Sequence, residues 1–215
     1  MWMYKISIPH LLSTKGREVP KSVLEAEKKH AIEAEYCRNV GARCEEFIEL
    51  RGRNIIKIGK LTFVEIEHGK GGKYQLQLVR PGSEDFVESV HLSVGPNEKI
   101  FKHPSIIERL STHRYRREGT SEMYLFIADD LKTHPDHRKI YEEMLLKRFR
   151  DFKVDPRTKP DMQILDVPYR PRGALREELE KKYGTTEFDR LALMIISVFW
   201  LSHWRTSVVM RNYMR

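Results

Sequence analysis

The chain of 215 residues has little that would mark it as a secreted, membrane-spanning or zinc-finger protein. Its two cysteines, Cys37 and Cys44, are too few for a disulfide framework and lack zinc-finger spacing. The longest apolar run, residues 191–204, is shorter than the roughly 20 residues that span a bilayer. The first residues lack the basic and then apolar order of a secretory signal. We therefore expect an intracellular protein in a reducing compartment, cytoplasmic or within a ribonucleoprotein assembly, with no transmembrane segment.

The short motifs of several enzyme classes are also missing. There is no Gly-x-Ser-x-Gly elbow for nucleophilic hydrolysis, and neither cysteine has a histidine placed to activate it. The glycine-rich segment 68–73 has neither the GxxxxGK[ST] order of a P-loop nor the GxGxxG order of a dinucleotide site. The sequence therefore favours a protein that is not an enzyme and has no cofactor.

What the sequence does contain is typical of a globular protein. Hydrophobic residues make up 40% and charged residues 33%, which fits neither a disordered chain nor a membrane protein. We divide the chain into an N-terminal arm and helical segment, residues 1–50, and a core domain, residues 51–215. The two could also form one continuous domain.

Alternating apolar and polar residues predict an antiparallel β meander. The alternation covers residues 54–67 and 73–80, and segment 68–73 between them reads as a glycine-rich hairpin loop. Residues 86–94 are a third candidate strand. The apolar runs 123–128 and 162–167 are two more.

Helical periodicity is expected elsewhere. It predicts helices at residues 22–37, 105–110, 136–152 and 173–183. The last expected helix, residues 187–213, is apolar on nearly every side over 191–201, which is typical of a central core helix or a subunit interface. The fold class predicted is therefore α+β, with an antiparallel meander packed against a long apolar C-terminal helix and with additional basic helices.

Positive charge is the strongest functional signal. Lys and Arg outnumber Asp and Glu, which gives a formal net charge of +8 and a pI of about 9.4. Much of this charge lies in the second half, in short clusters that also contain aromatic residues. Basic surfaces with exposed aromatics are typical of proteins that bind polyanions.

These clusters supply the predicted nucleic-acid-binding residues. The arginines and lysines would contact phosphates, while Tyr115 and Tyr169 would stack on bases. The predicted set is Lys70, Lys73, Arg114, Tyr115, Arg116, Arg117, Arg148, Arg150, Tyr169, Arg170 and Arg172. The leading hypothesis is non-catalytic binding of RNA or single-stranded DNA.

A second hypothesis is a Mg²⁺-dependent nuclease. Glu65 and Glu67 share one face of a predicted strand, so with Glu49 their carboxylates could bind one Mg²⁺, and Lys70 lies nearby. The arrangement resembles the restriction-endonuclease-like fold, although the usual Pro-Asp is absent and the lysine is displaced. Mg²⁺ is expected only under this alternative, and an ordinary solvated strand face is the simpler explanation of the glutamates.

Two further groups of residues resemble sites. The spacing of His134 and His137 suits Zn²⁺, but the sequence places no further ligand with them, and Asp136 is explained as a helix N-cap. The pair Asp129 and Asp130 fits a polar turn. No metal site is therefore predicted outside the nuclease alternative.

A third hypothesis is a structural or interaction protein. The 187–213 helix would then mediate homo-oligomers, and the basic charge would match an acidic partner or a membrane surface. Binding measurements with nucleic acid at two salt concentrations separate the three hypotheses.

Overall fold

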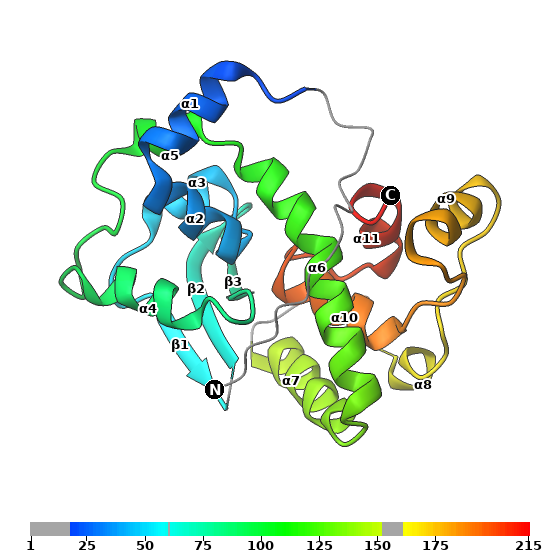
Figure 1. Cartoon of the computed structure of the whole chain (residues 1–215). Coiled ribbons are helices and arrows are strands. Elements are labelled where there is room, and N and C mark those ends of the chain that lie inside the picture. Colours follow the sequence, from blue (N-terminus) through cyan, green and yellow to red (C-terminus); the bar gives the residue numbers. More distant parts are fainter. Residues whose placement is uncertain (1–17, 60, 152–160) are drawn as a thin grey trace.

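The computed structural model describes residues 18–59, 61–151 and 161–215 (Figure 1). Within them it is an α+β structure with a three-stranded antiparallel sheet and eleven helices, as the sequence predicts. The strands are β1 (Ile55–Ile58), β2 (Leu61–Gly69) and β3 (Lys73–Leu78). The helices are α1 (Lys21–Lys29), α2 (Ala31–Val40), α3 (Cys44–Glu49), α4 (Glu84–Leu92), α5 (Pro104–Arg109), α6 (Thr112–Thr133), α7 (His137–Asp151), α8 (Met162–Leu165), α9 (Ala174–Tyr183), α10 (Arg190–Phe199) and α11 (Thr206–Asn212).

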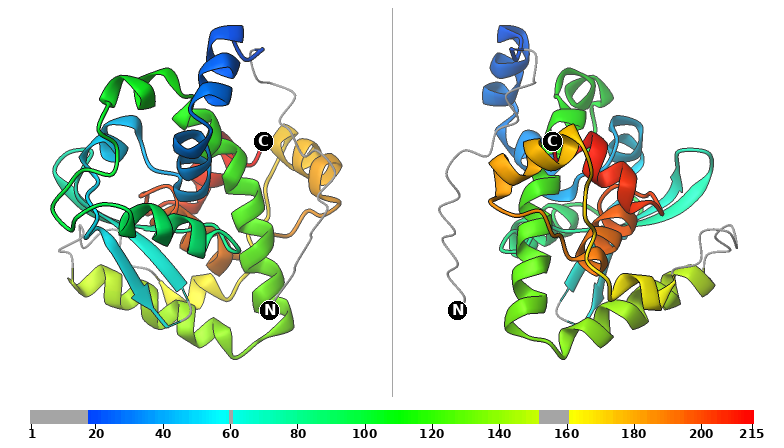
Figure 2. Two further views of the ribbon diagram at one scale, coloured as in Figure 1. Left: turned by 60° about the vertical axis from the view of Figure 1, so that its left-hand side comes forward. Right: turned by 90° about the vertical axis from the view of Figure 1, so that its right-hand side faces the viewer.

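The sheet is a meander in the order β1-β2-β3. Val64 of β2 pairs with Ile55 of β1 and with Gln77 of β3. The glycine-rich hairpin between β2 and β3 is where the alternation predicts it, and Gly71 and Gly72 have φ angles of 75° and 70°, which favour glycine. The hairpin end projects from the body of the molecule (Figure 2, right view).

Each face of the sheet belongs to a different hydrophobic cluster, because side chains alternate along a strand. Phe63, Leu76 and Leu78 pack with the second half of α6 and with α7, α10 and α11. Val64, Ile66 and Val79 pack on the other side with α2, α3, α4 and α5. The long helix α6 runs past both clusters (Figures 1 and 2). Helices α2 and α3 of the expected N-terminal segment 1–50 thus share a core with β2, while residues 1–17 lie outside the described part.

Three predicted strands are helical, and those predictions are wrong. Residues 86–94 fall largely within α4, whose buried Val87 and His91 are one helical turn apart. Residues 123–128 lie inside α6, where Met123 and Ile127 are buried with the same spacing. Residues 162–167 begin with the four-residue helix α8. Short apolar runs suit a buried strand and a buried helix equally, and packing decided for the helix.

Two predicted elements are divided in the structure. The expected helix 22–37 is interrupted at His30, whose φ and ψ of −120° and 55° end α1 before α2 begins. The expected strand 54–67 is a hairpin of β1 and β2, with Gly59 at φ 61°. A period-2 pattern continues across a tight turn, so alternation alone does not locate it.

The expected 187–213 helix is also divided. Helix α10 ends at Phe199, Ser202 has a positive φ of 54°, and α11 begins at Thr206. Trp200 follows α10 directly and is fully buried against Gly41 of the α2 end and Gly119 of α6. The apolar residues of α10 lie in the chain's own core, so an oligomer formed through this helix would compete with that core.

The remaining helix predictions agree with the structure. Helices α5, α7 and α9 lie at 104–109, 137–151 and 174–183, and Gly184 ends α9 in the left-handed conformation that its sequence position predicts. Position 152, the expected end of the helix containing α7, lies outside the described residues. In the part of the chain described here, none of the helices has both the length and the apolar character needed to cross a bilayer.

Candidate anion-binding site

The segment between α8 and α9 is fixed against the start of α10. Tyr169 and Phe188 exchange two backbone hydrogen bonds, of 2.8 and 3.0 Å, in an isolated β-bridge. Arg190 donates its Nε to the carbonyl oxygen of Val167 at 2.9 Å. The Arg190 guanidinium also lies over the Tyr169 ring, 5.3 Å from its centroid. A loop that carries basic residues is therefore held in a defined position.

The last residues of the chain lie on the other side of this loop. Met214 is fully buried, and its carbonyl oxygen accepts hydrogen bonds from Lys182 at 3.0 Å and Tyr183 at 3.1 Å, both on α9. These contacts bring Arg211 of α11 and Arg215 next to the loop between α8 and α9.

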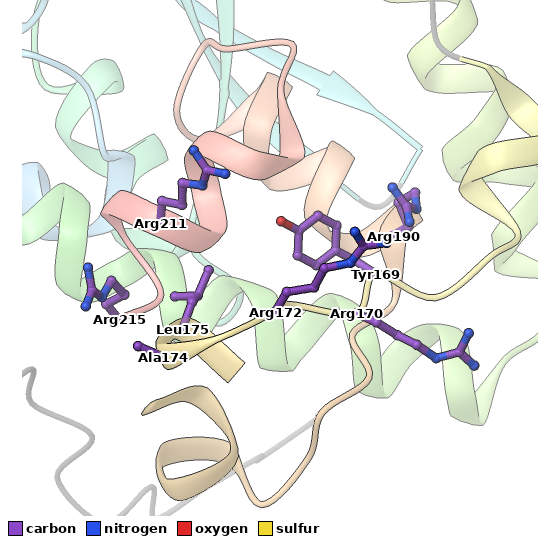
Figure 3. Close-up of a pocket in the computed structure, with 8 residues that line it drawn as sticks. All are labelled: Tyr169, Arg170, Arg172, Ala174, Leu175, Arg190, Arg211 and Arg215. Atoms are coloured by element: carbon purple, nitrogen blue, oxygen red, sulfur yellow. The ribbon is translucent and has the colours of Figure 1, made fainter. Parts of the chain in front are cut away.

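The loop between α8 and α9 and the last residues of the chain together line an open cavity of about 410 Å³. Five arginines line it, and none of its lining residues is acidic. Its lining residues are Tyr169, Arg170, Arg172, Ala174, Leu175, Arg190, Arg211 and Arg215 (Figure 3). We call it the arginine pocket.

The arginines of the pocket differ in how their charge is compensated. Arg170 pairs with Glu187 at 2.8 Å, and Arg215 pairs with Glu178 at 2.6 Å. In Figure 3 the Arg170 side chain extends away from Arg211 and Arg215. Arg190 is bonded to backbone carbonyls rather than to a carboxylate. The pocket is thus positively charged beyond what its own neighbours balance.

Arg172 and Arg211 are the uncompensated members of the pocket. Both side chains are exposed, and neither forms an ion pair or hydrogen bond with any residue that the structure describes. They come from different elements, the loop before α9 and helix α11. A guanidinium binds a phosphate or carboxylate through two parallel N–H donors, so two free guanidinium groups at one cavity suit an anionic ligand.

Part of this site was predictable from the sequence. The predicted residues Tyr169, Arg170 and Arg172 all line the pocket. Sequence reasoning missed Arg190, Arg211 and Arg215. Arg190 and Arg211 are single basic residues within the segment 187–213 that was predicted as one continuous helix, and Arg215 lies just after it. The break after α10 brings α11 beside the loop.

Arg114 and Tyr115 lie in a second, largely buried cluster. The buried carboxylate of Glu27 on α1 accepts hydrogen bonds from Arg114, from Tyr115 at 2.5 Å and from Arg38 at 2.9 Å. Burial acts to raise the pKa of Glu27, but the bonds from Tyr115 and Arg114 lower it below its ordinary value. The Tyr115 ring is 1% exposed, so it is not available to stack on a base.

Arg116 is buried as well, unlike the exposed side chain that its predicted role requires, whereas the prediction for Arg117 stays open. Arg116 is 2% exposed and donates to the carbonyl oxygen of Leu201. Its own carbonyl oxygen accepts from the indole of Trp200 at 2.9 Å. Burial, together with the nearby Arg43 charge, lowers the pKa of Arg116 to about 10. Arg117 is half-buried.

The two predicted binding arginines of α7 differ in exposure, since one lies in the core and the other in solvent. Arg148 is 8% exposed and donates to the carbonyl oxygen of Tyr74 at 2.6 Å, whereas Arg150 is exposed. Tyr141 and Leu145 are buried beside Arg148, while Ile140 is 56% exposed. The inward face of α7 thus carries Tyr141, Leu145 and Arg148.

Lys70 and Lys73 at the β2–β3 hairpin are exposed, as their predicted role requires. The backbone N–H of Lys70 donates to the buried Glu46 carboxylate at 3.3 Å.

Lys70 also contributes to a positive field at His203. Burial, and then the charges of Arg116 and Arg43, lower the pKa of His203 to about 4.

The glutamates of the nuclease hypothesis each have a partner. Glu65 accepts from the Tyr74 hydroxyl at 2.7 Å, Glu67 from Asn54 at 3.1 Å, and Glu49 pairs with Lys99 at 3.0 Å. Within the described residues these three carboxylates do not form a group that could hold a metal ion. The nuclease hypothesis therefore stays a prediction without support from this geometry.

One group of potential metal ligands does come together in the described part of the chain. It consists of Asp130, His134 and His137. The sequence suggested the two histidines but assigned Asp130 to a polar turn. Helix α6 in fact continues through Asp130, and one helical turn brings this carboxylate beside His134.

The two cysteines are free thiols. Burial raises the pKa of both Cys37 and Cys44, so neither is activated as a nucleophile.

No protein-family model, curated protein or solved structure was found to match this chain.

Proposed function

We propose that this protein binds single-stranded nucleic acid, RNA or DNA, without cleaving it, and that a backbone phosphate occupies the arginine pocket. The observation that carries the proposal is the pair Arg172 and Arg211, two exposed guanidinium groups without a partner among the described residues at a cavity lined by five arginines. Phosphate diesters are the anions that arginine recognises through two parallel hydrogen bonds.

The rest of the chain supports a polymer rather than a small anion. A net charge of +8 attracts polyanions over distances longer than a contact. Exposed basic residues outside the pocket, Lys70 and Lys73 at the hairpin and Arg150 on α7, could contact further phosphates. The pocket is open, which suits a strand that passes through it.

Tyr169 supplies the aromatic surface for a base. One face of its ring carries Arg190, so its orientation is defined before a ligand arrives. Its hydroxyl faces the side on which Arg211 lies (Figure 3). Stacking on an aromatic ring accepts any base, so we expect little sequence preference.

The test is a fluorescence-anisotropy titration of labelled single-stranded RNA, single-stranded DNA and duplex at two salt concentrations with Mg²⁺ present. The double variant Arg172→Ala/Arg211→Ala should weaken binding at low salt by at least tenfold. Each phosphate contact on a single strand contributes about 0.7 to the slope of log K against log salt, so the slope should fall by about 1.4. The control Lys102→Ala/Arg109→Ala removes two exposed charges near α5 and should leave both values nearly unchanged.

Three results would contradict parts of the proposal. Absence of binding at low salt would overturn nucleic-acid binding and favour an acidic protein or membrane partner. Tight binding that the pocket variant leaves unchanged would overturn the pocket as the site. A gel that shows cleaved probe after the titration would overturn the non-catalytic assignment. It would favour the nuclease hypothesis with Glu49, Glu65 and Glu67.

A further inference from the structure

The corner between α6 and α7 brings two histidines to one carboxylate. Asp130 lies in the last turn of α6, His134 caps that helix, and His137 is the first residue of α7. Nδ1 of His134 lies 3.3 Å from one carboxylate oxygen of Asp130, and Nδ1 of His137 lies 3.0 Å from the other. The same ring nitrogen of both histidines therefore faces the same carboxylate.

The three side chains are held in this arrangement. The two imidazole rings are stacked with their centroids 4.8 Å apart and an interplanar angle of 17°. The hydroxyl of the buried Tyr141, one turn into α7, donates to Asp130 at 3.1 Å. A hydrogen bond from a neighbouring residue that orients a carboxylate ligand is a recurrent feature of metal sites.

The spacing suits a tetrahedral ion. With bonds of about 2.0–2.1 Å from zinc to nitrogen or oxygen, the ligand atoms of a tetrahedron lie about 3.3 Å apart. One carboxylate oxygen of Asp130, Oδ1, lies 3.3 Å from Nδ1 of His134 and 3.1 Å from Nδ1 of His137. All the ligand atoms lie within 4.8 Å of one another, so an ion could bind between them once the side chains draw together.

The electrostatics of the corner also favour a cation. The carbonyl end of a helix carries a partial negative charge, and α6 with its 22 residues ends here. The nearest arginine of α7, Arg138, is directed to Asp166 at 2.9 Å and Asp189 at 3.1 Å. Its charge is thus balanced away from the corner.

We propose that Asp130, His134 and His137 bind one Zn²⁺ ion. Two imidazole nitrogens and one carboxylate oxygen are a ligand set that Zn²⁺ accepts, and they leave the fourth tetrahedral position for water. The His134 and His137 side chains are 48% and 34% exposed, so the ion can reach the site from solvent. The proposal is independent of the arginine pocket.

The experiment titrates EDTA-treated full-length protein with Zn²⁺ in competition with a chromogenic chelator. We expect one equivalent to bind, and Co²⁺ in its place should give the visible absorption of a tetrahedral site. His134→Ala and His137→Ala should each weaken binding by at least about a hundredfold, since even residues that only orient a ligand are worth 10- to 100-fold. Tyr141→Phe should weaken it by about tenfold.

The matched controls are His68→Ala and His103→Ala, which remove exposed histidines elsewhere and should leave the affinity unchanged. Thermal melts with and without Zn²⁺ show whether each variant is folded, and the wild type should melt higher with Zn²⁺ because the ion binds the folded state. Failure of the wild type to bind Zn²⁺ would overturn the proposal. So would binding that both His134→Ala and His137→Ala leave intact.

Discussion

Two arginine clusters of this protein have similar sequences and opposite surroundings. In the buried cluster, Arg114 and Arg116 of α6 are bonded to Glu27 and to the carbonyl oxygen of Leu201. In the arginine pocket, Arg172 and Arg211 are exposed and have no such partner in the described structure. Each cluster includes a local run of basic and aromatic residues, 114–117 in one and 169–172 in the other, yet only the pocket leaves positive charge for a ligand.

A sequence pattern of basic and aromatic residues shows that positive charge is present. It does not show whether that charge is exposed to a ligand or paired inside the fold. An arginine inside a protein must be hydrogen-bonded, because an unpaired buried charge is costly. Glu27 is about 90 positions before Arg114 in the chain, and Leu201 about as far after Arg116, so no local pattern reveals that these groups are their partners. Removing single residues from each cluster tests the distinction.

The largest effect is expected from Glu27→Ala in the buried cluster. The change removes the shared acceptor of Arg38, Arg114 and Tyr115 and leaves buried polar groups unpaired. The free energy of unfolding should fall by about 3 kcal/mol. Urea denaturation measures it, with Glu25→Ala, an exposed glutamate of the same helix, as the control. Equal stability of the two variants would contradict a structural role for this cluster.

A somewhat smaller loss is expected from Gly119→Ala. Within a helix this change ordinarily stabilises by up to about 1 kcal/mol. Here a Cβ atom would lie 2.4 Å from Cζ2 of the fully buried Trp200. Overpacking of this kind should lower the unfolding free energy by about 1–3 kcal/mol.

Gly95→Ala is the matched control for this change, since its Cβ would meet its nearest atom at an ordinary 3.4 Å. Thermal and urea denaturation of the two variants give the comparison. A Gly119→Ala variant as stable as the wild type would show that Trp200 does not fill this space.

A moderate effect is expected from pH at His203, which lies within the field of the buried Arg116. Its pKa is lowered from 6.5 to about 4 by burial and by neighbouring cations. The unfolded chain therefore takes up this proton near pH 6.5, while the folded protein resists it until about pH 4. Stability should be fully present above pH 6.5 and should decrease as the pH falls through this window.

The measurement is the melting temperature at several pH values for the wild type and for His203→Gln. The variant has no such group to titrate, so its melting temperature should decline less between pH 6.5 and 4. Identical slopes for the two proteins would contradict the shifted pKa.

The smallest effect on stability is expected in the arginine pocket. Arg172→Ala and Arg211→Ala remove exposed side chains that have no partner among the described residues, so each should change the unfolding free energy by less than about 0.5 kcal/mol. Urea denaturation checks this in the same preparation used for binding. A large loss of stability would show that these arginines serve the fold and not a ligand.

The sequence predicted the hairpin of β2 and β3 correctly, but it also predicted strands where the chain forms α4, part of α6 and α8. Along β2, Phe63 lies in one cluster and Val64 and Ile66 in the other, as alternation requires, because the two faces of a strand are set by neighbours in sequence. The strand prediction failed for Met123 and Val87, where short apolar runs suit either element. Of the candidate site, Tyr169, Arg170 and Arg172 could be found because they are adjacent in the chain.

By itself, the sequence determined the α+β class, the hairpin at Gly71 and Gly72, and the excess of positive charge, since these follow from composition and local periodicity. Only the tertiary structure decided which arginines are buried. It also ended α10 at Phe199, placed Arg211 and Arg172 at the same pocket, and continued α6 far enough to place Asp130 next to His134. Those outcomes depend on contacts between residues that are distant in sequence. The free energies of these contacts exceed the helix or strand propensity of any local segment.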